Sequence, residues 1–424
     1  MYQISTLKNG LRIITNKATG SRSVGIAVFV GAGGRYETEN YNGGVAHYLE
    51  HVLFKGSKKR PTPKKIAETI DRVGGDMNAY TAEDHTCYYV KLPKKHLHLG
   101  FDVLADNMIN PLFKNDEIER ERGVIIEEMN VYKDNPARYV FDLVGELMWP
   151  YDKLKTNVIG REEIIEKIPK KRIISYYNAL YTVDNMVVSV SGNVEHEEIV
   201  KLVKSKFARQ KTKAKMSFEK VKGSIAKNKS KLFFKDTNQA HFVICCRSVK
   251  LNTKNQIAFE LLSTILGGGM SSRLFLNVRE KKGLAYTIFA HNSGFVDSGK
   301  FEIYAGVNKN KVKEALRATM LEIKKIKNKP VSNRELDKAK EQVKGRLIMS
   351  QEDNGSVADR MGEQIILLDK ADTVEKTLKK IDKITSEDIQ KIADKYFRSK
   401  NFRLAVIGPF DENQQAEFEN LIKI

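Results

Sequence analysis

The chain contains 424 residues, of which 41% are hydrophobic and 30% are charged. This length predicts two or more domains, because one hydrophobic core rarely organises so many residues, and the composition excludes an intrinsically disordered chain. No apolar run is long enough to span a bilayer, and no basic stretch followed by an apolar one opens the chain, so we expect neither a membrane protein nor secretion. The three cysteines, Cys87, Cys245 and Cys246, form no C-x-x-C pair, which favours a reduced, cytoplasmic setting.

The formal net charge of +20 is of a kind found in proteins that bind nucleic acids or anionic surfaces. The lysines, however, are spread along the chain, and no basic motif interleaved with aromatic residues accompanies them. We therefore expect a solvated, lysine-rich surface, with neither nucleic acid nor membrane as a partner. The alternative, a nucleic-acid binder, predicts salt-sensitive binding to DNA or RNA.

Local patterns predict mixed secondary structure from the start of the chain. Residues 11–15 and 24–30 are apolar and rich in β-branched side chains, and a turn separates them, which we interpret as a hairpin. Gly43 and Gly44 then open a helical pattern that should end between residues 56 and 61. Further helices are expected at 64–73, 101–108, 116–133 and 257–266, and further strands at 78–80 and 86–92.

The second half of the chain repeats part of the first. Residues 168–192 match residues 384–408 without a gap, and both copies read as a helix, an aromatic residue, a turn with asparagine, and an apolar strand that ends in glycine. A repeat on this scale predicts two similar α+β domains from a duplicated unit. Residues 211–228 are lysine-rich with weak periodicity and are interpreted as an exposed linker. The predicted domains are then 1–210 and 229–424.

The strongest chemical signal is the pentapeptide from His47 to His51. Histidines four apart on a helix project from the same face, and neutral imidazole is a good ligand for zinc. Glu50 lies between them in the chain, where it can act as a general base beside the metal without ligating it. The order H-x-x-E-H is the inverse of the commoner H-E-x-x-H signature. The alternative is a polar helix face that carries two histidines by coincidence.

A catalytic zinc usually takes three protein ligands. The helix expected at 116–133 offers five glutamates, and two of them, Glu121 and Glu128, are seven residues apart and share a face. Charged clusters on helices usually face solvent. The residue types alone therefore leave the choice of the third ligand open.

At this point the sequence resembles a known family. The H-x-x-E-H motif, 76 intervening residues and then Glu128 look like the signature of the pitrilysin-type (M16, inverzincin) zinc metallopeptidases. Residues 44–56 (GVAHYLEHVLFKG) and 118–129 (IERERGVIIEEM) are similar to the mitochondrial processing peptidase β-subunit and its bacterial homodimeric relatives. The resemblance runs across nearly the whole chain.

The resemblance implies an α+β fold with two homologous domains, each a mainly antiparallel sheet flanked by helices, which together form half of a clam-shell chamber. It implies one Zn²⁺ per chain on His47, His51 and Glu128, with Glu50 as the base. Glu121 falls on a family position where a carboxylate can orient a ligating histidine.

Two further stretches resemble parts of the family's substrate site. Residues 75–81 are similar to an edge strand beside the metal, so Asn78, Ala79 and Tyr80 are expected to bind an extended peptide; the alternative is an ordinary sheet edge. Arg279 and Tyr286 match the family's R-x6-Y element, which implies that they reach the peptide and its developing oxyanion from the second domain.

These observations predict a zinc-dependent endopeptidase that hydrolyses peptides or unfolded segments bound as an extended strand. A homodimer is expected, because the bacterial homodimeric subgroup carries both elements in each chain. The alternative is a non-catalytic scaffold or binding subunit on the same fold, since some family members lose part of the metal motif. All four metal-site residues are present here.

Overall fold

The computed structural model describes residues 2–37, 43–207, 213–214 and 216–424. The chain forms two compact units, each assembled from separate segments. The first unit contains Met1–Met129, Thr156–Glu219 and Ile348–Thr373, and the second contains Asn130–Lys155, Lys220–Leu347 and Val374–Ile424. The duplication boundaries at 1–210 and 229–424 stay a prediction. Residues 208–210, at the end of the predicted first domain, and residues 211, 212 and 215 of the predicted linker lie outside the described residues.

The first unit is built on a six-stranded sheet within the described residues, in the order β1-β2-β6-β3-β5-β4. The strands are β1 (Tyr2–Thr6), β2 (Arg12–Lys17), β3 (Ser23–Val30), β4 (Asp76–Thr81), β5 (Thr86–Pro93) and β6 (Met186–Gly192). Only β2 and β6 pair in parallel; the other neighbours are antiparallel. The predicted hairpin of 11–15 with 24–30 is wrong, because β6 lies between these strands and offers both of them an apolar partner from far along the chain.

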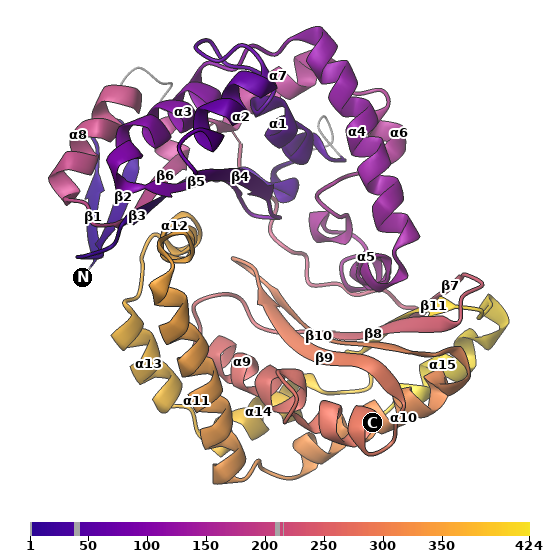
Figure 1. The fold of residues 1–424 in the computed structure, drawn as a ribbon. Coiled ribbons are helices and arrows are strands. Elements are labelled where there is room, and N and C mark those ends of the chain that lie inside the picture. The colour runs from indigo at the N-terminus through magenta and orange to yellow at the C-terminus, as the bar shows by residue number, and fades with distance from the viewer. Residues whose placement is uncertain (1, 38–42, 208–212, 215) are drawn as a thin grey trace. The chain divides into compact units, whose positions relative to one another are not determined.

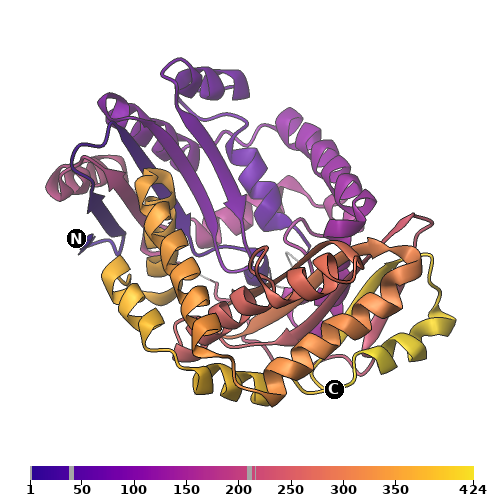
Figure 2. The same cartoon turned by 60° about the horizontal axis from the view of Figure 1, so that its bottom comes forward.

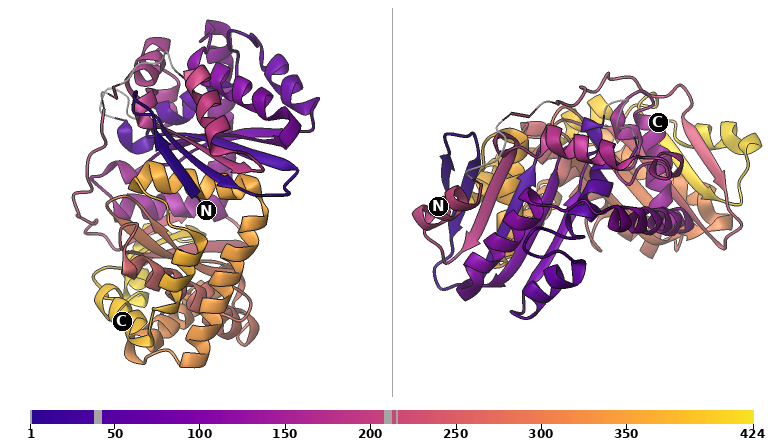
Figure 3. Two further views of the ribbon diagram at one scale, coloured as in Figure 1. Left: turned by 90° about the vertical axis from the view of Figure 1, so that its left-hand side faces the viewer. Right: turned by 90° about the horizontal axis from the view of Figure 1, so that it is seen from above.

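One face of this sheet is covered by α12 (Asn354–Leu368). The other face carries α1 (Val45–Leu53), α3 (Leu97–Ile109) and α8 (His196–Phe207) (Figures 1 and 3). Ala27 and Phe29 of β3 belong to the apolar cluster that also contains Val357 and Met361 of α12. Gly362 permits this close approach, because a Cβ atom there would lie 2.1 Å from a ring carbon of Phe29.

The other helices of the first unit come earlier in the chain than α12. They are α1 (Val45–Leu53), α2 (Pro63–Asp71), α3 (Leu97–Ile109), α4 (Asn115–Asp134), α6 (Glu162–Ile165), α7 (Lys170–Leu180) and α8 (His196–Phe207), with α4 continuing into the second unit. The helices predicted at 64–73, 101–108 and 116–133 correspond to α2, α3 and α4.

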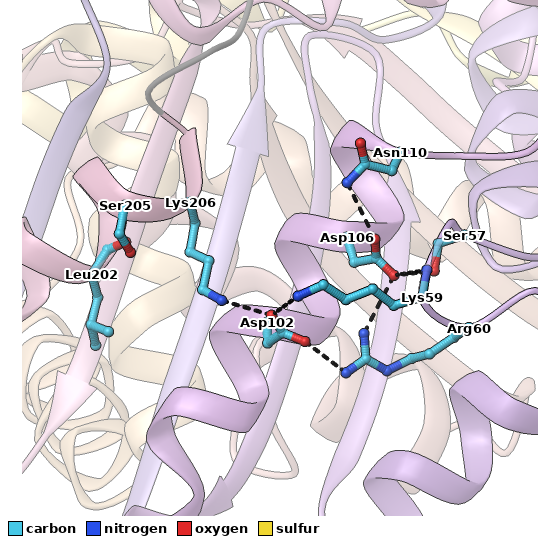
Figure 4. A network of polar contacts seen from close by, with 9 residues as sticks. All are labelled: Ser57, Lys59, Arg60, Asp102, Asp106, Asn110, Leu202, Ser205 and Lys206. Atoms are coloured by element: carbon cyan, nitrogen blue, oxygen red, sulfur yellow. Dashed lines mark hydrogen bonds and ion pairs between the residues drawn. The ribbon is translucent and has the colours of Figure 1, made fainter.

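The loop that follows α1 is fixed to α3 by two carboxylates (Figure 4). The Ser57 hydroxyl donates to Asp106 Oδ2 at 2.6 Å, and Arg60 donates to Asp102 Oδ2 at 2.8 Å. Lys206 of α8 donates to the other oxygen of Asp102 at 2.7 Å. These contacts hold the chain that leaves the histidine-bearing helix.

The second unit contains a sheet with the order β7-β11-β8-β10-β9 in the described part of the chain. Its strands are β7 (Ser230–Phe234), β8 (Gln239–Arg247), β9 (Ala285–Gly294), β10 (Gly299–Asn308) and β11 (Arg403–Gly408). β7 and β11 pair in parallel and the other neighbours are antiparallel. This is the order and sense of β2-β6-β3-β5-β4, so the fold is α+β with two homologous, mainly antiparallel sheets, as predicted.

The repeated segments also agree in detail. They form α7 followed by β6 in one copy and α14 (Ser386–Tyr396) followed by β11 in the other. The amide nitrogen of Asn185 donates to the Leu180 carbonyl at 2.9 Å, and that of Asn401 donates to the Tyr396 carbonyl at 2.9 Å. In both copies, therefore, asparagine closes the same turn between helix and strand.

α5 (Pro136–Met148) covers one face of the second sheet, where Val140 and Leu143 share a cluster with Val243 and Ala405. α9, α10 and α14 cover the other face (Figure 2). The remaining helices are α9 (Lys254–Gly267), α10 (Val312–Asn328), α11 (Asn333–Met349), α13 (Val374–Asp382) and α15 (Gln415–Leu421). Short 3-10 turns occupy Gly34–Tyr36, Lys94–His96, Lys153–Lys155, Val183–Asn185, Lys309–Lys311, Ser350–Glu352 and Glu412–Gln414.

No helix among the described residues combines the length and the apolar character that a membrane crossing requires.

Candidate metal centre

The helix that carries the motif is fixed at its first residue. Gly44 caps α1 with a φ of +106°, a conformation that favours glycine. The buried carboxylate of Glu37 accepts hydrogen bonds from the backbone N–H groups of Gly43, Gly44 and Ala46 at 2.7, 2.8 and 2.9 Å. A negative charge at this end of the helix satisfies donors that have no partner within it. The position of His47, in the first turn, depends on this anchor.

Three predicted ligands converge in the first unit. The donor atoms of His47, His51 and Glu128 all lie within 4.8 Å of one another. Glu128 Oε2 lies 3.7 Å from His47 Nε2 and 3.6 Å from His51 Nε2. Four tetrahedral ligands about 2.1 Å from one ion would lie about 3.4 Å apart, so the two distances from Glu128 to the histidines are close to those of ligands on a single zinc ion.

The protonation state of His47 also suits metal binding. Burial, and to a smaller extent the neighbouring His51, lower the pKa of His47 to about 3, so this imidazole is neutral near pH 7 and its lone pair is free to ligate. Two imidazoles and one carboxylate are a donor set of catalytic zinc sites, which leave a fourth position for water or substrate.

Glu121 orients one of the histidines. Its Oε2 lies 3.0 Å from Nδ1 of His51, which leaves Nε2 of that ring facing Glu128, and Lys55 contacts its Oε1 at 2.7 Å. Burial raises the pKa of Glu121, but the hydrogen bonds from His51 and Lys55 lower it by more, so this pKa lies below its usual value. The buried Tyr48 hydroxyl donates to the Ile118 carbonyl at 2.5 Å and ties α1 to α4, the helix that carries both glutamates.

Glu50 faces the strand β4. Its Oε2 accepts a hydrogen bond from the Thr81 hydroxyl at 2.5 Å. Burial raises the pKa of Glu50, while the bond from Thr81 opposes this rise. A carboxylate with these surroundings is suited to proton transfer beside the three ligands.

β4 is an edge strand, as its sequence suggested. It pairs with β5, and no other described strand pairs with its outer edge. The side chain of Asn78 accepts from the Ala79 N–H at 2.9 Å, and Tyr80 donates to Asp359 of α12 at 2.7 Å. The structure thus places Asn78, Ala79 and Tyr80 on a free edge next to the residue that holds Glu50.

Arg279 and Tyr286 lie together in the second unit. Arg279 belongs to a π-helical segment, Phe275–Glu280, a rare geometry that is frequent at functional sites. Its guanidinium carbon lies 4.6 Å from the ring centre of Phe275 and 5.9 Å from that of Tyr286, which is 75% exposed. The action of this pair on a bound peptide stays a prediction.

Three residues of the site escaped the sequence analysis. Lys55 lies four residues after His51 but beyond the end of α1 at Leu53, so helical spacing did not connect its side chain to Glu121. Thr81 ends the N-A-x-T stretch, but nothing in the sequence connected it to Glu50. Glu37 precedes α1 by several residues and showed no pattern that separates a capping carboxylate from a surface one.

The chain is similar to known proteins over nearly its whole length. The sequence profile described as "Insulinase (Peptidase family M16)" matches residues 12–162, and the one described as "Peptidase M16 inactive domain" matches residues 167–343. The chain is 33% identical over 410 residues to the "Uncharacterized zinc protease YmxG" of Bacillus subtilis, covering 96% of this chain and 98% of that protein. An uncharacterized zinc protease of Streptomyces coelicolor is 32% identical, with 99% and 92% coverage.

The chain belongs to peptidase family M16. Solved structures agree with this assignment. The M16 chain superposes on a protease from Helicobacter pylori with a TM-score of 0.90 and 25% identity, covering 96% of this chain and 100% of that one. A structure described as a peptidase M16 inactive domain, from Pseudomonas fluorescens, has the same fold, with a TM-score of 0.89, 17% identity, and coverage of 97% and 98%.

The helix of the second unit that corresponds to α1 lacks the H-x-x-E-H motif. α9 follows β8 as α1 follows β3, and residues 257–268 (IAFELLSTILGG) align without a gap on 45–56 (VAHYLEHVLFKG). Phe259, Leu262 and Ser263 stand where the first unit has His47, Glu50 and His51. Because these three side chains are buried in the core, α9 of the second unit offers no ligand set of this kind.

Proposed function

We propose that this M16 protein is a zinc-dependent endopeptidase that hydrolyses peptides or unfolded segments bound as an extended strand. The convergence of His47, His51 and Glu128 beside Glu50 carries the proposal. Membership of a peptidase family and relatives named zinc proteases support it. We propose one zinc ion per chain.

We propose that the following residues bind the metal and orient its ligands. His47, His51 and Glu128 would hold the zinc ion, and Glu121 with Lys55 would hold the ring of His51. When bound, zinc supplies a Lewis acid that acidifies water and polarises a carbonyl group.

Glu50 moves the proton. Thr81 donates to Oε2 of Glu50, and the Glu50 carboxylate would take the proton from the attacking water and return it to the nitrogen of the leaving amine. The outer edge of β4 would bind the peptide through the main-chain groups that point away from β5, which within the stretch from Asn78 to Tyr80 are those of Ala79. Such main-chain hydrogen bonds give affinity with little sequence preference.

We also propose that Arg279 and Tyr286 contact the bound peptide, Arg279 at a carbonyl and Tyr286 at the developing oxyanion. Tyr286→Phe and Arg279→Lys should each lower kcat/KM without changing the zinc content. Unchanged kinetics in both variants would remove this part of the proposal.

The working form is proposed to be a cytoplasmic homodimer. The resemblance to the bacterial homodimeric subgroup supports the dimer, and the three buried, unpaired cysteines support a reducing compartment. Sedimentation of the purified chain at micromolar concentration should give a mass of about two chains.

The proposal is tested by measuring zinc content and peptide cleavage for the wild type and for Glu50→Gln. We expect about one zinc per chain in both proteins, because Glu50 is not a ligand, and cleavage only by the wild type. Equal cleavage by the variant would refute the mechanism. A metal-free wild type that still binds peptides would favour the alternative, a non-catalytic scaffold or binding subunit.

A further inference from the structure

The hydrogen bond between Thr81 and Glu50 joins the sheet edge to the base. Thr81 is the last residue of β4, and its hydroxyl donates to Glu50 Oε2 at 2.5 Å. These residues are 31 positions apart in the chain. The role argued here for Thr81 rests on the proposed function.

The backbone of Thr81 faces the free edge. The Ala82 N–H donates to the His85 carbonyl at 2.8 Å, and the pairing of β4 with β5 continues without a shift through Tyr80 and Cys87. In an antiparallel pair, alternate residues exchange both hydrogen bonds with the partner strand. Even-numbered residues of β4 therefore bond to β5, and the backbone groups of Thr81 point outward.

The side chain of Thr81 points to the face of the sheet that carries α1. Side chains alternate along a strand, and Tyr80 reaches Asp359 of α12 on the opposite face. One residue thus presents its main chain to an incoming peptide and its hydroxyl to the catalytic carboxylate.

We infer that Thr81 is a positioning residue for hydrolysis: it fixes Oε2 of Glu50 and sets the carboxylate in register with a peptide strand added to β4. The bond fixes one oxygen of the carboxylate and so limits the orientations in which Glu50 can receive the proton. Without the hydroxyl the carboxylate can rotate, so the peptide would still bind at the edge, but the base would less often be aligned with the attacking water.

The chain offers a matched control in the cross-strand partner of Thr81. Thr86 of β5 is paired with Thr81, is fully buried, and donates its hydroxyl to the Ala32 carbonyl at 2.7 Å. Thr81→Val and Thr86→Val therefore remove the same group from the same pair of strands, but only the first removes a bond to Glu50.

The test compares kinetics on one fluorogenic peptide with the zinc-loaded proteins. We expect Thr81→Val to lower kcat about tenfold or more, as for loss of a hydrogen bond to a charged group, with KM changed less than about twofold. Thr81→Ser should restore most of kcat, and Thr86→Val should keep the kcat of the wild type. In a Glu50→Gln background, Thr81→Val should leave the peptide Kd and the residual cleavage unchanged.

Each outcome decides the matter. If Thr81→Val has the kcat of the wild type, or if only its KM changes, the inference about Thr81 is overturned. The proposed function still stands in that case, provided that Glu50→Gln is inactive. Full cleavage by Glu50→Gln overturns the function itself. If Thr81→Val melts at a lower temperature than Thr86→Val, the valine itself destabilises the protein, and the kinetics of Thr81→Ala and Thr81→Ser replace those of Thr81→Val as the test. A wild-type kcat in Thr81→Ala, or a kcat in Thr81→Ser as low as in Thr81→Ala, overturns the inference.

Discussion

Glu128 and Glu127 are adjacent on α4, but only Glu128 faces the histidines. Oε2 of Glu128 lies 3.7 Å from His47 Nε2 and 3.6 Å from His51 Nε2, whereas Glu127 is exposed. Glu128→Gln keeps the shape and replaces the only anionic donor of the three by a neutral amide. Because loss of a partner that merely supports a ligand lowers metal affinity by about 10–100-fold, we expect loss of this ligand to cost at least about 100-fold, or about 2.7 kcal/mol.

The assay is competition for zinc against a chromophoric chelator at pH 7, with metal analysis of the loaded proteins. Glu127→Gln is the control, since it removes the same charge one residue away and should change affinity by less than about twofold. Both metal-free variants should melt near the wild type. Equal loss of affinity in the two variants, or an unchanged affinity in Glu128→Gln, would refute the assignment of the third ligand.

Three further predictions concern the surroundings of the site. Glu121→Gln should lower zinc affinity by about 10–100-fold, less than Glu128→Gln, because it loosens the ring of His51; an unchanged affinity would contradict the orienting role. Tyr48→Phe should lower the free energy of unfolding by about 1 kcal/mol through loss of the bond to the Ile118 carbonyl, as measured by urea denaturation, and a variant as stable as the wild type would count against that bond. Burial and the neighbouring Asp359 raise the pKa of Glu363 from 4.5 to about 7, so the native state keeps a proton that the unfolded chain releases in this window, and stability falls as the pH rises through it. Glu363→Gln should therefore be more stable than the wild type above pH 7 and should lose the advantage near pH 4.5; parallel stability curves would exclude this effect.

The sequence by itself predicted the features that depend on neighbours along the chain. His47, Glu50 and His51 lie within two turns of one helix, so helical geometry alone brings them together. The duplication could be recognised in the sequence because its features are also local. Asn185 and Asn401 each close a turn with a carbonyl five residues back. The edge strand at 78–80 was predicted by the resemblance of residues 75–81 to the family, and the structure places it at the edge of the first sheet.

Only the tertiary structure decided which distant segments meet. β6 separates β2 from β3, and α12 and α5 each cover a sheet that lies far from them in the sequence. The residue types left five glutamates open and the family resemblance pointed to Glu128, but only the tertiary structure brings Glu128 to the two histidines. The position of β4 beside α1 likewise joins Thr81 to Glu50. Such contacts form because burial of apolar faces brings the elements together, and that burial depends on the whole core rather than on any local pattern.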